Sequence, residues 1–116
     1  MVNYIQKAKK RKKAKIEKKR KALKSEAYRL VELLKKRDFK FEKLFLFGSV
    51  ISEKPLGPWS DIDLVVKGLN SKNYYKMYSF LLQNSKFPVD LKPYEDIKKS
   101  FKKKVKHRGE LLYEKQ

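Results

Sequence analysis

Apolar residues follow two different spacings along this chain, and the change from one to the other predicts the order of its elements. Between residues 23 and 34 they recur in steps of three and four, which is the spacing of one face of an amphipathic helix. The positions are Leu23, Ala27, Leu30, Val31 and Leu34. Residues 41–47 (FEKLFLF) instead end in a nearly continuous apolar run, which predicts a strand covered on both faces that stops at Gly48.

The middle of the chain continues with turn signals and shorter apolar runs. Ser49 is expected to cap a short helix, and a loop rich in Pro and Gly follows it. A strand is predicted over 61–67, and Ser71 is the expected cap of the next helix. The apolar face of that helix is expected to contain Tyr74, Met77, Tyr78, Leu81 and Leu82.

The last third predicts one more strand and one more helix. The strand is expected over 87–92, and apolar residues that step by four from Ile97 to Val105 predict a helix that Gly109 ends. A short apolar end follows at 111–113. The order helix, strand, short helix, strand, helix, strand, helix predicts a small α/β or α+β fold.

Length and charge narrow the class of protein. The 116 residues are enough for one domain but too few for two separate cores. The net charge of +19 is far above what solubility requires, and it indicates a polyanionic partner such as RNA, DNA, an acidic protein or an anionic surface. The chain has no cysteine and one histidine, so any metal ion must be held by oxygen ligands.

The charge is concentrated near the N-terminus. Residues 7–24 hold twelve Lys or Arg against one acid, Glu17, and lack the apolar face of a packed helix. We expect a helical or half-ordered basic arm over 1–21 and a globular domain over 22–116. The favoured partner of the arm is RNA or another nucleic acid, and the alternatives are an acidic protein or a role as a solubility tail. The residues expected to bind nucleic acid are Lys9, Lys10, Arg11, Lys12, Lys13, Lys19 and Arg20.

The sequence gives no sign of a membrane protein. No apolar run approaches the roughly 20 residues of a membrane span. The basic N-terminus is not followed by the apolar core of a secretory signal. We therefore expect a cytoplasmic protein with no membrane partner.

Three aspartates form the constellation most informative about chemistry. Asp61 and Asp63 are two residues apart in an extended segment, so their side chains share a face of the sheet about 6.6 Å apart by Cα. Asp90 lies on a strand that can pair beside theirs. Carboxylates are the ligands that Mg²⁺ prefers, and two Mg²⁺ ions can neutralise a triphosphate and align its attack. We expect all three to bind metal, and Asp90 also to act as the general base.

The turn at Gly48 and Ser49 is the expected phosphate site. Gly48 lets a triphosphate approach the backbone, and the Ser49 hydroxyl can bond phosphate oxygens. Ser60 and Lys54 are further expected contacts of the nucleotide. Trp59 is interpreted either as a stacking partner of the base or as an anchor of its loop.

These motifs resemble a known family. The segments FLFGS at 45–49, SDIDL at 60–64 and VDL at 89–91 are similar to those of minimal nucleotidyltransferases of the DNA polymerase beta superfamily, and the likeness extends from about residue 23 to 113. The resemblance implies a mixed sheet flanked by helices. It also implies transfer of a nucleoside monophosphate from an NTP, with ATP the expected donor, to a hydroxyl group.

The chain departs from the family pattern in two ways. Val50, Ile51 and Ser52 stand where an Arg commonly follows the Gly-Ser pair, and the spacer before Asp61 is one residue longer than usual. The departures imply weaker triphosphate binding or a reliance on Lys54. A degenerate site that binds without turnover is the alternative.

Two functional hypotheses follow. In the first, the chain is a Mg²⁺-dependent nucleotidyltransferase, and the resemblance implies a small helical toxin partner that it modifies on tyrosine and so neutralises. In the second, the fold is a weak or inactive module that binds RNA through its basic arm. The sequence leaves open whether two copies form a homo-oligomer.

Overall fold

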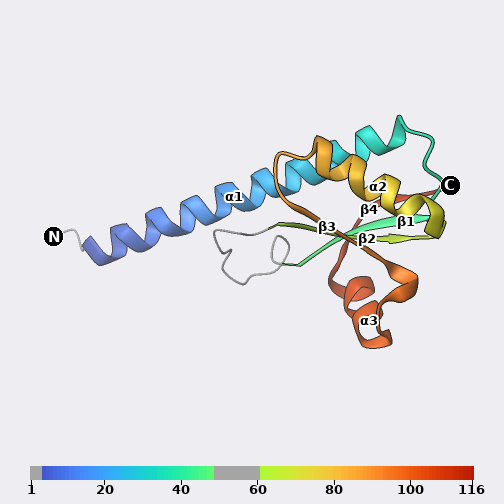
Figure 1. Cartoon of the computed structure of the whole chain (residues 1–116). Coiled ribbons are helices and arrows are strands. Elements are labelled where there is room, and N and C mark those ends of the chain that lie inside the picture. The colour runs from blue at the N-terminus through green and yellow to red at the C-terminus, as the bar shows by residue number, and fades with distance from the viewer. Residues whose placement is uncertain (1–3, 49–60) are drawn as a thin grey trace.

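The computed structural model describes residues 4–48 and 61–116, which form three α-helices and one four-stranded sheet (Figure 1). Their bounds are α1 Tyr4–Lys35, β1 Lys43–Phe47, β2 Ile62–Lys67, α2 Ser71–Asn84, β3 Val89–Pro93, α3 Lys99–Arg108 and β4 Glu110–Glu114, with a 3₁₀ turn η1 at Tyr94–Asp96. The expected α+β class, a small mixed sheet flanked by helices, is confirmed.

The sheet has the order β3-β2-β1-β4. β1 pairs antiparallel with β2 and with β4, whereas β2 and β3 are parallel and are joined through α2. The parallel pair is possible because a helix carries the chain back along the sheet. Both carboxylate-bearing segments therefore enter the sheet at the same end.

Alternation along the strands divides the core into two layers. Ile62, Leu64 and Val66 of β2 are buried in the larger cluster, which contains the apolar residues of α1 and α2. Val65 points the other way, into a smaller cluster with Val105 of α3. Figure 1 shows the corresponding arrangement, with α1 and α2 on one face of the sheet and α3 on the other.

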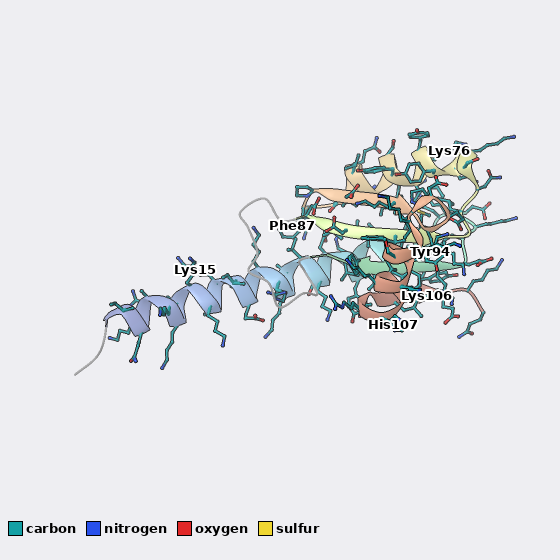
Figure 2. All side chains as sticks on the ribbon, turned by 90° about the horizontal axis from the view of Figure 1, so that it is seen from below. Lys15, Lys76, Phe87, Tyr94, Lys106 and His107 are labelled. Carbon is teal, nitrogen blue, oxygen red and sulfur yellow. The ribbon has the colours of Figure 1, made fainter. Side chains whose placement is uncertain are left out.

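Helix α1 is much longer than the face that it packs. Leu23 is fully buried, and from there to Leu34 the stripe predicted from the sequence faces the core. Before Leu23 nearly every side chain is exposed, and Lys15 projects from a rod that leaves the sheet (Figures 1 and 2). The rod gives the molecule its extent of 61 Å along one axis against 30 and 24 Å along the others.

A buried carboxylate fastens α1 to the chain between α2 and β3. Glu26 is 4% exposed and accepts hydrogen bonds from Arg29 Nε at 2.5 Å, Arg29 Nη2 at 2.8 Å and the Lys86 backbone N–H at 2.5 Å. Arg29 Nη2 also donates to the Asn84 carbonyl at the end of α2. The hydrogen bond from Arg29 holds the pKa of Glu26 below its usual value, against the opposing effect of burial.

Several local predictions were wrong. The cap of α2 is Asn70, whose side chain accepts from the Lys72 N–H, and Ser71 is the first helical residue. Leu82 is 53% exposed because it lies off the buried face that Met77 and Leu81 form. The expected short helix at Ser49 lies outside the described residues.

The strands also differ from their predicted limits. β1 and β3 begin two residues later than expected. The apolar end at 111–113 is part of β4, an edge strand that the sequence did not identify and that pairs with β1 across a local shift in register. Gly109 does end α3, donating its N–H to the Val105 carbonyl. Within residues 4–48 and 61–116, no helix is long and apolar enough to cross a membrane.

We predict that Glu26→Gln destabilises the protein by about 2 kcal/mol, because it removes the charge from hydrogen bonds that a carboxylate makes. The folded-state pKa of Glu26 is lowered, so its stabilising contribution is present above pH 4.5 and is lost as the pH falls through the folded-state value. Urea melts between pH 3 and 7 should therefore show a steeper acid loss for the wild type than for the variant.

Glu32→Gln is the matched control. Glu32 forms an exposed pair with Lys35 on the same helix, so its replacement should change stability by less than about 0.5 kcal/mol. Equal effects of the two substitutions would show that Glu26 does not anchor the helix.

Candidate active site

The predicted carboxylates lie at one end of the two parallel strands. Asp63 is the second residue of β2 and is paired in register with Asp90, the second residue of β3. Asp61 directly precedes β2, and its side chain interacts with that of Asp63. The expectation that the strand of Asp90 pairs beside that of Asp63 is confirmed. All three side chains belong to the α3 side of the sheet, opposite the main core.

Asp63 lies in surroundings that disfavour its charged form. The pKa of Asp63 is raised to about 7, first by burial and then by the negative charge and hydrogen bond of Asp61, while Asp90 adds to the rise and Lys92 opposes it. A carboxylate with this pKa is costly to ionise without a cation nearby. Concentrated negative charge of this kind is a common feature of functional sites.

Lys92 is the basic residue that faces the acids. It lies two residues beyond Asp90 on β3, and its Nζ donates to Asp90 Oδ2. Among residues 4–48 and 61–116, no three acidic or histidine side chains are arranged as a ready metal site. The types of side chain nevertheless fit Mg²⁺, because all three are carboxylates at the same end of the parallel strands. The raised pKa of Asp63 also means that a nearby cation would stabilise its charged form. The ligands would be Asp61, Asp63 and Asp90.

Gly48 has a role here that its motif did not indicate. Its φ of +89° is a left-handed conformation that favours glycine, and a Cβ at this position would overlap the carboxylate of Asp63. Phe47, the preceding residue, is the register partner of Asp63 on β1. The absence of a side chain therefore makes room for the aspartate.

A hollow of about 170 Å³ opens beside these residues. Its walls combine the acid, the lysine and the aromatic side chains of β1 and α3. The lining residues are Phe47, Gly48, Asp63, Leu64, Val65, Lys92 and Phe101. Phe47 and Phe101 meet edge to face with ring centroids 5.0 Å apart, so α3 forms a fixed apolar wall for the hollow.

Two tyrosines that the sequence indicated only as helix packing support Asp90. Tyr74 and Tyr78 of α2 donate their hydroxyls to the carbonyls of Leu91 and Val89, which flank Asp90 on the edge strand. These bonds satisfy carbonyls that no further strand pairs, and they fix the backbone that carries the acid. Their i and i+4 spacing on the helix before that strand was the available signal.

Other predicted residues are not part of this arrangement. Ser49, Lys54, Trp59 and Ser60 lie outside the described residues. The basic residues predicted to bind nucleic acid are all on α1, most of them on its exposed rod.

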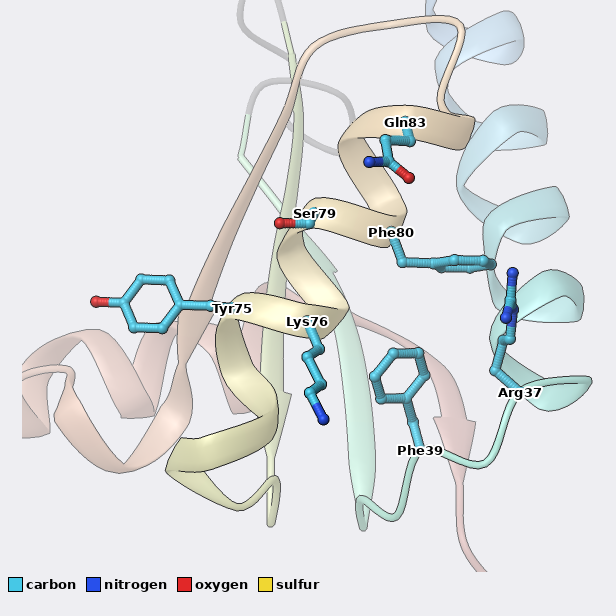
Figure 3. Close-up of a pocket in the computed structure, with 7 residues that line it drawn as sticks. All are labelled: Arg37, Phe39, Tyr75, Lys76, Ser79, Phe80 and Gln83. Carbon is cyan, nitrogen blue, oxygen red and sulfur yellow. The ribbon is translucent and has the colours of Figure 1, made fainter.

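A second hollow lies on the opposite side of the sheet, beside α2 and the end of α1, with a volume of about 490 Å³ (Figure 3). There Arg37 lies over the ring of Phe80 at 4.8 Å from its centroid, and Phe39 packs against the same ring at 6.0 Å. No carboxylate is among its lining residues in the described part of the chain. We interpret it as the packed junction between the two helices.

Comparison with protein families decides the assignment. The family model described as polymerase beta nucleotidyltransferase matches residues 28–116. The chain belongs to the polymerase beta nucleotidyltransferase family. It is therefore a nucleotidyltransferase, and the resemblance seen in its motifs is confirmed.

Solved structures show the same fold. A crystal structure of the toxin–antitoxin MntA–HepT is similar with 21% identity and a TM-score of 0.57, covering 80% of this chain and 74% of that one. A crystal structure of a toxin–antitoxin with AMP-PNP is similar with 23% identity and a TM-score of 0.61, covering 78% and 74%. A comparison with curated proteins gives no significant match.

We predict that Asp63→Asn stabilises the metal-free protein above pH 7. The folded-state pKa of about 7 lies above the ordinary 3.8, so the folded state holds the proton more tightly and loses stability as the pH rises from about 4 to 7. The amide cannot ionise and avoids that loss. Thermal melts in EDTA at pH 5 and pH 8 should show the difference between variant and wild type growing with pH by several degrees.

Asp38→Asn, at an exposed position after α1, is the control and should show no such growth. Adding Mg²⁺ at pH 8 should stabilise the wild type more than Asp63→Asn. A variant no more stable than the wild type at pH 8 in EDTA would mean that ionising Asp63 costs the folded protein no stability.

Proposed function

We propose that the chain transfers a nucleoside monophosphate, with ATP as donor, to a hydroxyl group of a protein partner in a Mg²⁺-dependent reaction. The observation that carries the proposal is the register of Asp63 with Asp90 at the sheet end beside Gly48. When bound, Mg²⁺ would neutralise the triphosphate and orient it for attack. Asp61, Asp63 and Asp90 would hold it.

Other residues of the site have proposed roles in excluding water and accepting a proton. Phe47 and Phe101 exclude water from one side of the hollow, which strengthens electrostatic interactions within it. Asp90 would accept the proton of the attacking hydroxyl, since its side chain is 35% exposed and it lies on the edge strand β3. Pyrophosphate leaves as the new phosphodiester bond forms.

The acceptor is proposed to be a small helical protein of a toxin–antitoxin pair. Support comes from the similar structures, which are of toxin–antitoxin complexes, one of them with AMP-PNP. The described residues form one sheet with its flanking helices, and we infer that the partner brings its hydroxyl to the hollow beside Gly48. A tyrosine on a helix surface fits that requirement.

We predict that the purified chain binds ATP with Mg²⁺ and labels a co-expressed helical partner from α-labelled ATP. Asp61→Asn and Asp63→Asn should lose ATP affinity in calorimetry, because each removes a metal ligand. Asp90→Asn should lower turnover by about 10² or more with a smaller loss of affinity, as expected for a general base.

Asp38→Asn should behave as the wild type in both measurements. Full activity of Asp63→Asn in a folded protein would rule out the proposed site. Tight ATP binding without labelling of any partner would favour the degenerate site.

A second candidate function is nucleic-acid binding by the exposed part of α1. The observation that favours it is a helical rod with cations on every side: eleven of the twelve Lys or Arg residues of 7–24 precede Leu23, where burial begins. Like charges four residues apart repel along this helix, and a polyanion would relieve the repulsion. The contacts would be with phosphates and would not depend on base sequence.

We predict that single-stranded RNA binding by the full chain weakens steeply with salt, with a slope of log K against log salt of about −0.7 per phosphate contact. Changing Lys9, Lys10, Arg11, Lys12 and Lys13 together to Gln keeps the helix but should flatten that slope by up to about 3.5. Fluorescence titration of a labelled oligonucleotide at several salt concentrations measures it.

Lys103→Gln with Lys104→Gln, at exposed positions of α3, is the comparison outside the arm; it removes two charges instead of five and should change the slope far less per charge removed. A slope that the arm variant leaves unchanged would make an acidic protein the favoured partner.

A further inference from the structure

The ion pair between Asp90 and Lys92 has no evident structural purpose. Both side chains are partly open to solvent, with 35% and 46% of their surface exposed. An exposed pair of this kind contributes little to folding stability. Its position matters more, because the pair engages a carboxylate that the proposed reaction uses, and because Lys92 lines the hollow beside Gly48.

All three carboxylates of the site favour the charged form of Lys92. Its pKa is raised first by the hydrogen bond to Asp90 and further by the charges of Asp63 and Asp61. Among the described residues that line the hollow, it is the one basic side chain. Its register partner on β2 is Val65, so the ammonium group is placed over the sheet face that the hollow exposes.

We propose that Lys92 is a tethered counter-ion that holds Asp90 in the nucleotide-free protein and exchanges this carboxylate for a phosphate oxygen of the incoming triphosphate. The inference rests on the proposed nucleotidyltransferase function and assigns a nucleotide-binding residue to the same site. No covalent step is involved. The exchange replaces one charge-assisted hydrogen bond by another of the same kind.

The physical reason for the exchange is competition for one carboxylate. Asp90 Oδ2 becomes fully available to a divalent cation when its contact with Lys92 opens, and a cation bound at Asp90 repels the ammonium group. The hollow beside Gly48 and Asp63 is the nearest place where a triphosphate would offer negative charge. The flexible stem of lysine allows this movement without a change in the backbone.

The exchange also accounts for a feature of the sequence. The positions after Ser49 carry Val50, Ile51 and Ser52 and supply no cation to the triphosphate. Lys92 would supply one from β3, a strand whose backbone accepts hydrogen bonds from the tyrosines of α2.

The test compares Lys92→Met and Lys92→Arg with the wild type. Mn²⁺ binding to the nucleotide-free protein is measured by electron paramagnetic resonance, and AMP-PNP binding with Mg²⁺ by calorimetry. Lys92→Met should bind Mn²⁺ about tenfold more tightly, because Asp90 is free, and AMP-PNP about tenfold more weakly, because one charged contact is lost. Lys92→Arg keeps the charge and should stay near the wild type in both.

Lys67→Met is the matched control. Lys67 lies on the same sheet face but places its Nζ 5.1 Å from the Tyr94 ring centroid, where Lys106 of α3 also lies (Figure 2), so neither affinity should change. Unchanged affinities in Lys92→Met, with a wild type that binds both ligands, would overturn the role of Lys92 alone. A wild type that binds neither Mn²⁺ nor AMP-PNP would overturn the proposed function together with it.

Discussion

Every second residue of β2 is buried against α1 and α2, and the residues between them face α3 and carry the acidic group that defines the site. The period of two that puts Ile62 and Leu64 into the core therefore puts Asp63 on the opposite face. A slip of one residue would bury the carboxylate in the apolar cluster and expose the leucine. The same alternation therefore fixes both the packing of the core and the position of Asp63 in the candidate site, and parallel pairing with β3 extends it to Asp90.

The site is an acidic centre in a strongly basic protein. Net charge of +19 favours the approach of any polyanion, including a nucleotide, while three carboxylates at the sheet end provide the local negative charge that a divalent cation requires. The attraction by the net positive charge and the attraction by the local carboxylates act over different distances. Long-range attraction comes from the whole surface, and placement depends on contacts such as that of Lys92 with Asp90.

Motifs and periodicity predicted the part of the fold that depends on local patterns. The stripe of α1, the strands β1 to β3 and the placement of Asp63 beside Asp90 follow from the spacing of apolar residues, because burial imposes that spacing. The edge strand β4, the anchor at Glu26 and the hydroxyl bonds of Tyr74 and Tyr78 depend on residues distant in sequence, and single positions carry little sign of them. Lys92 is an example of what the sequence does not reveal. Its proposed role depends on its contact with Asp90 and on a hollow that residues of three other elements line.

The continuity of α1 has a consequence for how its basic half exists. In an isolated peptide with this density of like charge, helix nucleation would be unfavourable and few interactions would offset it. Here the half that begins at Leu23 is held by the core, so the exposed half needs only to propagate from turns that are already formed. The N-terminal part of α1 therefore depends on the folded domain for its helical order. If that domain unfolded, this part of the chain would lose the turns from which its helix propagates.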